Sequence, residues 1–340
     1  MTKPIGIGII GMGFMGQTHT RSFLADPSGA GSLVAVCDRD PDRRAGISSD
    51  AGNIGSDLSG GRLFDPDEVV GYEDPEALFA DPRIDLVSIC THTDTHIELA
   101  IRALRAGKHV LVEKPVATQP EQIEQLIREA ESAGRICVPA MCMRHWPGWS
   151  DLRTLIDSKE FGTVTHARFE RLGAAPRWSH GFYADESKSG GAIFDLHIHD
   201  VDMVCWLFGT PRQVRSIGSS RHVATQYVFK NGPSVQTEGG WLIDPSFPFR
   251  MSFIVEFEHA VAAFDSAAPQ PMIIYAEGEP HPVSLPSTTG YDQQATAVLH
   301  AISTGELSRL PTLEDALAVT RVIHAERRSV LDGVPVDLTD

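Results

Sequence analysis

The sequence is poor in basic residues and contains no run of them. Lys and Arg together number 29 against 45 Asp and Glu, which gives a formal net charge of −16. A protein that binds nucleic acid neutralises phosphates with clustered positive charge. The charge balance therefore argues against a nucleic-acid partner.

Long apolar runs and paired cysteines are also absent. No stretch approaches the roughly twenty apolar residues that span a bilayer, so we expect no membrane association. An apolar run already begins at Ile5, which leaves no room for a signal peptide before it. The cysteines are scattered and form no C-x-x-C pair: Cys37, Cys90, Cys137, Cys142 and Cys205. Reduced, buried thiols in a cytoplasmic protein explain this pattern.

A glycine-rich turn stands near the start of the chain, at Gly11-Met-Gly-Phe-Met-Gly16. It follows the apolar run Ile5–Ile10 and precedes a segment of helical character, Gln17–Leu24. A second apolar run, Leu33–Cys37, ends on Asp38. Strand, glycine turn, helix and a distant acidic residue in this order form the fingerprint of a dinucleotide site.

Each part of this fingerprint has a mechanical role. Gly11 allows the tight turn, Gly13 lets the backbone approach a pyrophosphate, and Gly16 lets helix and strand pack closely. The N–H groups that begin the helix, including those of Phe14 and Met15, face the phosphates.

Asp38 bears on the choice of dinucleotide. Its carboxylate would accept hydrogen bonds from the adenosine ribose and repel a 2′-phosphate, which favours NAD. Arg39 and Arg43 lie close by in sequence and could pair with that phosphate, which leaves NADP as the alternative.

Short apolar runs alternate with helical patterns through the first 140 residues, which indicates βαβ units and a parallel sheet. We expect strands at Ile5–Ile10, Leu33–Cys37, Val69–Tyr72, Leu86–Cys90, Val110–Val112 and Ile136–Val138. We expect helices at Gln17–Leu24, Pro75–Phe79, Thr95–Ala106 and Pro120–Ala133. The sequence therefore predicts an α/β Rossmann domain over residues 1–139, with a loop at 46–67.

Beyond residue 140 strand-like runs follow one another without helices between them, which is typical of an antiparallel or mixed sheet. We expect strands at Val164–Leu172, Gln213–Ser219, Ala224–Phe229, Val235–Ile243, Met251–Phe257, Ala260–Asp265 and Met272–Ala276. We expect helices at Trp149–Ser158, Tyr291–Ser303 and Leu313–Leu331. Residues 140–340 are therefore predicted to form an α+β domain with an open, largely antiparallel sheet.

Ligands of doubly wound sheets bind beyond the carboxyl ends of the strands. That rule nominates the residues after the fourth and fifth main strands, Thr91–His96 and Glu113–Pro115. Lys114 there could hydrogen-bond a substrate oxygen and exchange a proton with it. Pro115 fixes the turn and is a candidate for a cis peptide bond that would aim Lys114.

A second candidate constellation lies between Ser189 and Gly209, where the pattern favours a helix. On one helix Asp195 and His199 share a face, which Asp202 and Trp206 continue, while His197 points the opposite way. A carboxylate one turn from an imidazole can fix its tautomer and raise its basicity. The alternative is a strand that would place Asp195, His197 and His199 on one face as metal ligands. We favour the helix and expect no metal.

Three of these features together resemble the family named for glucose–fructose oxidoreductase, inositol dehydrogenase and a rhizopine-catabolism protein (Gfo/Idh/MocA). They are Gly11-x-Gly13-x-x-Gly16, the segment Ala106–Pro115, and Gly190-Gly-x-x-x-Asp195-x-x-x-His199-x-x-Asp202. The resemblance covers essentially the whole chain. It implies an NAD(P)-dependent oxidoreductase acting on sugars, inositols or other polyols. It further implies that the second domain's sheet floors the substrate site and joins subunits into a homodimer or homotetramer.

The resemblance also implies roles for single residues. Lys114 would contact the reacting hydroxyl or carbonyl, and His199 would act as general acid/base with Asp195 as its partner. Arg144 would make a substrate or structural contact. Residues expected to contact the cofactor through the loops after the strands are Thr91, His92, His96, Glu113 and Lys114. Apart from the resemblance, Arg177, Trp178, His180, Tyr183 and Trp241 are candidate pocket residues that would give polar contacts and an aromatic wall to a sugar ring; the alternative for the two tryptophans is a place in the core or an interface.

The chain departs from the family pattern in one loop. The family commonly reads Thr-Pro-Asn-x-x-His after the fourth main strand, whereas this chain has His92 and Thr93 in place of the proline and asparagine. The departure puts the usual loop contacts to the nicotinamide ribose in doubt. Two other functions remain open: glycoside cleavage through transient oxidation, and a non-catalytic NAD-dependent sensor.

Overall fold

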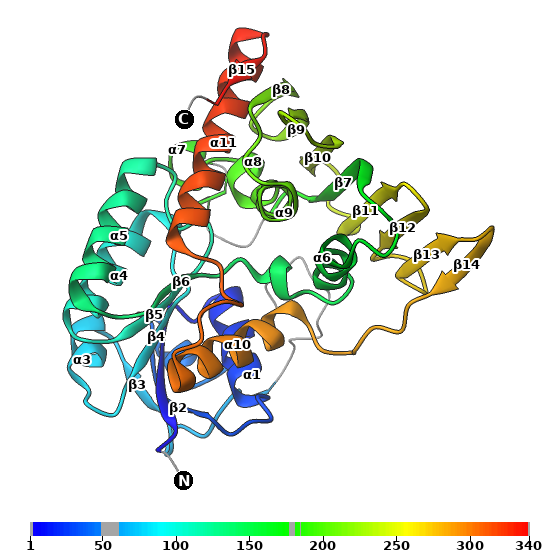
Figure 1. Ribbon diagram of the computed structural model, residues 1–340. Coiled ribbons are helices and arrows are strands. Elements are labelled where there is room, and N and C mark those ends of the chain that lie inside the picture. The colour runs from blue at the N-terminus through cyan, green and yellow to red at the C-terminus, as the bar shows by residue number, and fades with distance from the viewer. Residues whose placement is uncertain (1–2, 49–60, 177–180, 184, 339–340) are drawn as a thin grey trace. The chain divides into compact units, whose positions relative to one another are not determined.

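The computed structural model describes residues 3–48, 61–176, 181–183 and 185–338 (Figure 1). The chain forms two compact units, one comprising Met1–Cys142 with Thr289–Ala316 and the other Met143–Thr288 with Leu317–Asp340. The sequence-based division assigned everything beyond residue 139 to the second domain. The segment Thr289–Ala316 corrects it, because this segment packs in the first unit.

The first unit is built on a six-stranded parallel sheet in the order β3-β2-β1-β4-β5-β6. Its strands are β1 (Ile5–Ile10), β2 (Gly31–Cys37), β3 (Val70–Tyr72), β4 (Leu86–Ile89), β5 (His109–Val112) and β6 (Cys137–Pro139). The predicted Rossmann fold is confirmed. The strand order reverses between β1 and β4, and ligands of such sheets bind beyond the carboxyl ends of the strands at this point.

Helices cover both faces of this sheet (Figure 1). On one face lie α1 (Phe14–Leu24) and α10 (Gly290–Thr304); on the other lie α3 (Pro75–Ala80), α4 (Thr93–Arg105) and α5 (Pro120–Ala133). The side chains of Val298 and Leu299 on α10 are fully buried in the same core as Ile7 and Ile9 of β1. This packing explains why a segment close to the end of the sequence belongs to the first unit. A short helix that the sequence analysis missed, α2 (Pro41–Arg44), follows β2.

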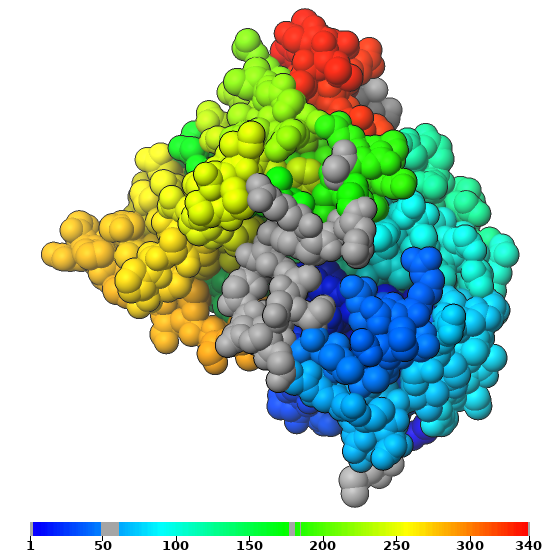
Figure 2. Space-filling view, turned by 180° about the vertical axis from the view of Figure 1, so that it is seen from behind, coloured from blue at the N-terminus to red at the C-terminus, as the bar shows by residue number. Residues whose placement is uncertain are grey.

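The second unit is built on a nine-stranded mixed sheet in the order β14-β13-β12-β11-β7-β10-β9-β8-β15. Its strands are β7 (Val164–Ala174), β8 (Gln213–Gly218), β9 (His222–Val228), β10 (Ser234–Leu242), β11 (Arg250–Phe257), β12 (Ala260–Asp265), β13 (Met272–Ala276), β14 (Glu279–Pro282) and β15 (Val336–Asp337). Only β7 and β10 pair in parallel among these strands, so the largely antiparallel sheet is confirmed. Figure 2 shows β13 and β14 in orange, at one end of the sheet.

One face of this sheet is covered by helices. They are α6 (Trp149–Ser158), α7 (Glu186–Ser189), α8 (Ala192–Asp195), α9 (Ile198–Phe208) and the greater part of α11 (Leu313–Asp332), with the 3₁₀ turn η1 (Cys142–His145) preceding them. Trp149 of α6 is fully buried, with its ring 5.2 Å from that of Phe253 and 5.9 Å from that of Phe169. Within the described ranges no helix combines the length and apolarity needed to cross a bilayer.

Candidate functional site

The glycine turn after β1 has the geometry that its sequence predicts. Gly11 adopts φ +86°, and a Cβ there would lie 2.8 Å from the Cys90 carbonyl oxygen. A Cβ on Gly16 would lie 1.9 Å from the Gly11 carbonyl oxygen. Only glycine fits at either position. At Gly11 the positive φ and the nearby carbonyl oxygen exclude a side chain, and at Gly16 the close contact between α1 and the turn excludes it.

Gly13 differs from both, since a Cβ there would meet nothing within 4 Å. Its backbone is extended, and it caps α1 without a side-chain hydrogen bond. The first turn of α1 carries no acidic residue. A helix N-terminus with open space at its cap and no acidic competitor fits an anion such as a pyrophosphate. Phe14 and Met15 contribute backbone N–H groups to this end, while the Met15 side chain packs against the core.

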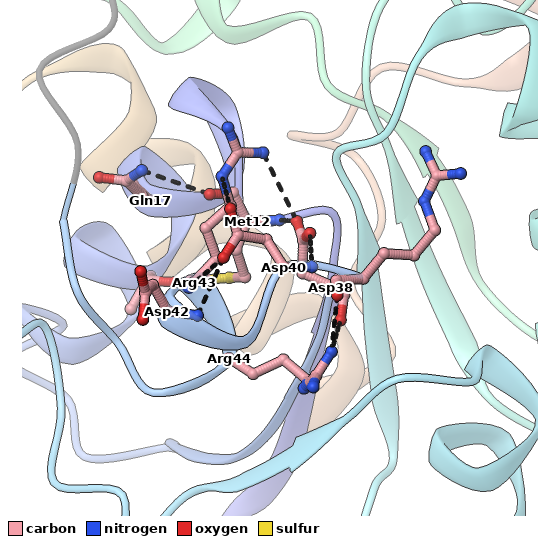
Figure 3. Close-up of polar contacts among 9 residues, drawn as sticks. Met12, Gln17, Asp38, Asp40, Asp42, Arg43 and Arg44 are labelled. Atoms are coloured by element: carbon pink, nitrogen blue, oxygen red, sulfur yellow. Dashed lines mark hydrogen bonds and ion pairs between the residues drawn. The ribbon is translucent and has the colours of Figure 1, made fainter.

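Asp38 at the end of β2 is held by two backbone N–H groups (Figure 3). Oδ2 accepts a hydrogen bond from the N–H of Met12 at 2.7 Å, and Oδ1 accepts one from the N–H of Asp40 at 3.0 Å. Nη1 of Arg43 lies 3.8 Å from Oδ2. The carboxylate is half-buried and fixed at the place where a dinucleotide ribose meets the second strand of such sheets, and each of its oxygens can accept a further bond.

The arginines beside Asp38 differ in what they contact. Nη1 of Arg44 donates to the carbonyl oxygens of Asp38 at 2.8 Å and Arg39 at 2.9 Å, so it braces this turn (Figure 3). Arg39 itself is exposed. The sequence predicts Asp38, Arg39 and Arg43 at this place, whereas the contact of Arg44 with the turn was not predicted.

The loops after β4 and β5 are joined by His96. This buried side chain lies on α4, with Nε2 3.0 Å from the Thr91 carbonyl oxygen and Nδ1 2.9 Å from the Pro115 carbonyl oxygen. Burial lowers the pKa of His96. Both ring nitrogens therefore lie beside backbone carbonyl oxygens, so His96 links the two loops and its ring does not project into the space beyond them. His92, which precedes α4, is exposed, and Thr91 is half-buried.

Lys114 stands directly beyond β5, and its peptide bond to Pro115 is cis, as expected from the sequence. The neighbours Glu113 and Pro115 are buried, whereas Lys114 is half-buried. Glu113 accepts a hydrogen bond from the Lys114 backbone N–H at 3.0 Å through Oε2. Its Oε1 lies 3.0 Å from Nε2 of His19. Glu113, which was expected to contact the cofactor, thus has partners within the protein for both oxygens.

In the second unit Asp195 and His199 do not lie on one helix, so that prediction is wrong. Asp195 ends α8, and α9 begins at Ile198. The N–H of His197 bonds the Ala192 carbonyl oxygen at 2.9 Å, five residues back, which widens the turn. The His197 ring then lies against Gly239, where a Cβ would be 2.6 Å from its Nδ1. The helix is therefore interrupted between α8 and α9, where the His197 side chain packs against the sheet beside Gly239.

Asp195 and His199 nevertheless share an environment. They are half-buried, while every other residue from Gly191 to Asp202 is buried. Both lie in helices and not in a strand, which removes the alternative that grouped them with His197 as metal ligands. In the parts of the chain that the structure describes, no group of three His, Cys, Asp or Glu side chains could hold a metal ion.

Buried ion pairs to three different elements fix the start of α9 around His199. The carboxylate of Asp200 pairs with Arg171 of β7 at 3.0 Å, and that of Asp202 pairs with Arg144 of η1 at 2.7 Å. Immediately before the helix, Nε2 of His197 lies 3.2 Å from Glu326 of α11. The nearby Glu326 carboxylate raises the pKa of His197 although burial opposes it. These pairs leave little freedom to the backbone that carries His199.

Arg144, expected to make a substrate or structural contact, makes a buried ion pair within the protein. Its side chain is 6% exposed, donates to both carboxylate oxygens of Asp202, and lies over the Trp206 ring. Of the candidate pocket residues, Trp241 is buried and Tyr183 packs against it with ring centroids 5.7 Å apart. Arg177, Trp178 and His180 lie outside the described residues.

Comparison with known proteins identifies both halves of the chain. Residues 5–141 match the oxidoreductase family with an NAD-binding Rossmann fold, and residues 149–265 match the GFO/IDH/MocA C-terminal domain. The chain belongs to the GFO/IDH/MocA oxidoreductase family. Its first unit is accordingly an NAD-binding Rossmann domain, in agreement with the glycine turn and Asp38.

Relatives and neighbours within this family are distant in sequence. Inositol 2-dehydrogenase 1 of Saccharopolyspora erythraea is 26% identical over 98% of this chain and 96% of its own. Inositol 2-dehydrogenase 2 of the same organism is 30% identical over 60% of this chain, a match that spans 54% of the relative. The crystal structure of levoglucosan dehydrogenase with NADH and levoglucosan shares the fold, with a TM-score of 0.83 and 19% identity over 99% of this chain and all of its own.

Three buried residues that pair with the candidates or their chain neighbours were not predicted from the sequence, namely His19, Arg171 and Glu326. A signal for the first was present. His19 lies three residues after Gly16 and hence on the helix face that packs against the sheet, where an ionisable side chain needs a partner. No local pattern points to Arg171 or Glu326, because their partners are 29 and 129 positions away.

Proposed function

We propose that this protein is an NAD-dependent dehydrogenase that interconverts a secondary alcohol and a ketone on a sugar, inositol or related polyol. The observation that carries the proposal is the pair of half-buried polar sites that rigid elements hold: Lys114 beyond β5, and Asp195 with His199 at the junction of α8 and α9. Family membership supports the reaction class, and the names of the inositol dehydrogenases among its relatives support the substrate class.

The roles follow from the chemistry of the side chains. Bound NAD would accept the hydride that leaves the carbinol carbon. His199 takes the hydroxyl proton as general base, and Asp195 orients the imidazole and stabilises its protonated form. The Lys114 ammonium donates a hydrogen bond to the same oxygen and stabilises the negative charge that develops there.

We infer a preference for NAD over NADP from Asp38. Its carboxylate is fixed by the N–H groups of Met12 and Asp40, so it cannot turn away from a 2′-phosphate without losing both bonds. The side chain of Arg43 lies beside Asp38 and Asp40, which reduces the charge that it could offer to a phosphate.

Replacement of Lys114 or His199 tests the proposal. Lys114→Ala and His199→Ala should each lower kcat by about 10²-fold or more, because each removes a group that acts on the reacting oxygen. The dissociation constant for NAD, measured by calorimetry, should change little. Thr304→Val is a matched control, since its hydroxyl bonds the His300 carbonyl oxygen within α10. Unchanged turnover in either alanine variant would remove that residue from the mechanism.

We also infer that the uncovered face of the nine-stranded sheet joins subunits. Four large apolar side chains are exposed on it, Ile217, Val228, Ile254 and Tyr275, on four different strands. Exposed apolar groups on one face mark an interaction surface. Ile254→Glu should dissociate the oligomer in sedimentation velocity, and an unchanged sedimentation coefficient would exclude Ile254 from the interface.

A further inference from the structure

A chain of buried polar contacts runs from α1 to the residue before Lys114. Nδ1 of His19 lies 2.7 Å from Oγ of Ser88 and 3.5 Å from Sγ of Cys90. Nε2 of His19 lies 3.0 Å from Oε1 of Glu113, whose Oε2 accepts the Lys114 N–H. Side chains from α1 (His19), from β4 (Ser88) and from the residues directly after β4 and β5 (Cys90 and Glu113) thus meet inside the first unit.

The charge of this cluster is fixed by its surroundings. Burial by itself would lower the pKa of His19, but Cys90 and Glu113 outweigh it and raise that pKa to about 10. The Glu113 carboxylate, whose Oε1 lies 3.0 Å from Nε2, favours the protonated form of this imidazole. The side chains of His19 and Glu113 are 2% and 5% exposed, so both charges are paired away from water.

We propose that His19 and Glu113 are positioning residues that hold Lys114 in its working orientation and tie it to the dinucleotide-binding helix. The inference rests on the role proposed for Lys114. Glu113 acts on the lysine through its backbone N–H, and His19 acts through Glu113. Because His19 lies one turn beyond Gly16 on α1, the same helix that begins at the glycine turn also fixes the lysine.

Two observations favour this role over a contribution to stability alone. A buried ion pair gives little net stability, since desolvation offsets most of its attraction. The pair also acts together with a second anchor on the same loop, His96, which bonds the Pro115 carbonyl oxygen. The backbone on both sides of the Lys114–Pro115 bond is thus tied down by buried side chains, while Lys114 itself stays half-buried.

The test uses the full-length chain and the isosteric variants His19→Gln and Glu113→Gln, alone and combined. Each single change should lower kcat by about 10-fold to 10²-fold, as expected for a misplaced catalytic group, with little change in NAD affinity. The combined change should cost no more than the larger single one, because both act through one route. Thr20→Val is the matched control, since this neighbour on α1 is equally buried and its hydroxyl contacts Gly16 and Met12.

A second readout reports on Lys114 without any turnover. The chain has six lysines, Lys3, Lys108, Lys114, Lys159, Lys188 and Lys230. Reductive ¹³C-methylation therefore gives few NMR signals, and Lys114→Arg assigns the one of interest. The chemical shift of that signal should change in His19→Gln and Glu113→Gln and remain unchanged in Thr20→Val. Glu113→Asp, which keeps the charge but is too short for both bonds, should move it as well if the glutamine variants fold poorly.

The outcomes separate this inference from the proposed function. If the Lys114 signal moves in His19→Gln and Glu113→Gln while the wild-type protein turns over no polyol, the positioning role is sustained and the dehydrogenase proposal fails. A signal and a kcat that both stay unchanged in folded His19→Gln and Glu113→Gln would overturn the positioning role.

Discussion

Gly13→Ala should separate cofactor binding from folding. Gly13 has φ −71° and ψ −160°, an extended conformation that alanine adopts, and the added Cβ would meet no protein atom within 4 Å. The free energy of unfolding without ligand should therefore stay the same or rise by about 0.4–1 kcal/mol, because alanine restricts the unfolded chain. Only a ligand at the N-terminus of α1 would meet the methyl group.

The expected loss appears in NAD affinity. If the methyl group prevents one charge-assisted hydrogen bond to the pyrophosphate, the loss is about 1.5–3 kcal/mol. That loss corresponds to a dissociation constant raised roughly 10-fold to 150-fold. Isothermal calorimetry with NAD and urea unfolding without it measure the two quantities on the same preparation.

Gly16→Ala is the contrasting variant. Its Cβ would lie 1.9 Å from the Gly11 carbonyl oxygen, so α1 must shift, and both stability and NAD affinity should fall. Wild-type NAD affinity in Gly13→Ala would refute the placement of the pyrophosphate at this turn.

Three further predictions concern charge. Arg171→Met leaves the fully buried Asp200 without its bidentate partner and should lower the free energy of unfolding, measured in urea titrations, by about 3–5 kcal/mol. Adding Asp200→Asn should recover part of this loss, and a loss below about 1 kcal/mol would contradict the pairing. Folding raises the pKa of His19 from 6.5 to about 10, so the protonated imidazole contributes a stabilisation relative to the neutral one that is complete below pH 6.5 and is lost as the pH rises through 10. The stability difference between wild type and His19→Gln should therefore shrink from pH 6 to pH 10, and a difference that grows over this range would reverse the assigned sign. Asp38→Ala should improve the kcat/KM for NADP relative to NAD by about tenfold, because it removes the repulsion of a 2′-phosphate, and an unchanged ratio would show that Asp38 does not select the cofactor.

Local patterns predicted most of the fold. The bounds of α5, α6, β12 and β13 agree with the expected ranges, because apolar periodicity, proline starts and glycine stops act over a few residues. The short helix α2 was missed although its signal is local: Asp40 accepts from the N–H groups of Asp42 and Arg43, and Pro41 occupies the first helical position.

The remaining differences come from contacts between residues far apart in sequence. The break between α8 and α9 depends on room beside Gly239 for the His197 ring, about forty positions away. Likewise, the short strand β15 exists only because it pairs with β8. The packing of α10 against β1 and β2 is equally invisible to a local pattern.

For the site, the sequence predicts the half-buried candidate residues but not the buried residues around them. Lys114, Asp195 and His199 stand out as polar residues in glycine-rich or strand-end positions. His19, Arg171 and Glu326 read locally as ordinary polar positions of a helix or strand. Their role becomes visible only once their partners in the fold are known.

Transfer of deuterium tests the central claim most directly. Inositols, hexoses and glucosides that carry deuterium on their carbinol carbons would be incubated with the protein and NAD, and the NADH analysed by mass spectrometry. The account predicts deuterated NADH that accumulates in equal amount with a ketone product for at least one of these polyols. Release of a leaving group without accumulated NADH would point to transient oxidation instead, and NAD binding without deuterium transfer from any of them would contradict the dehydrogenase.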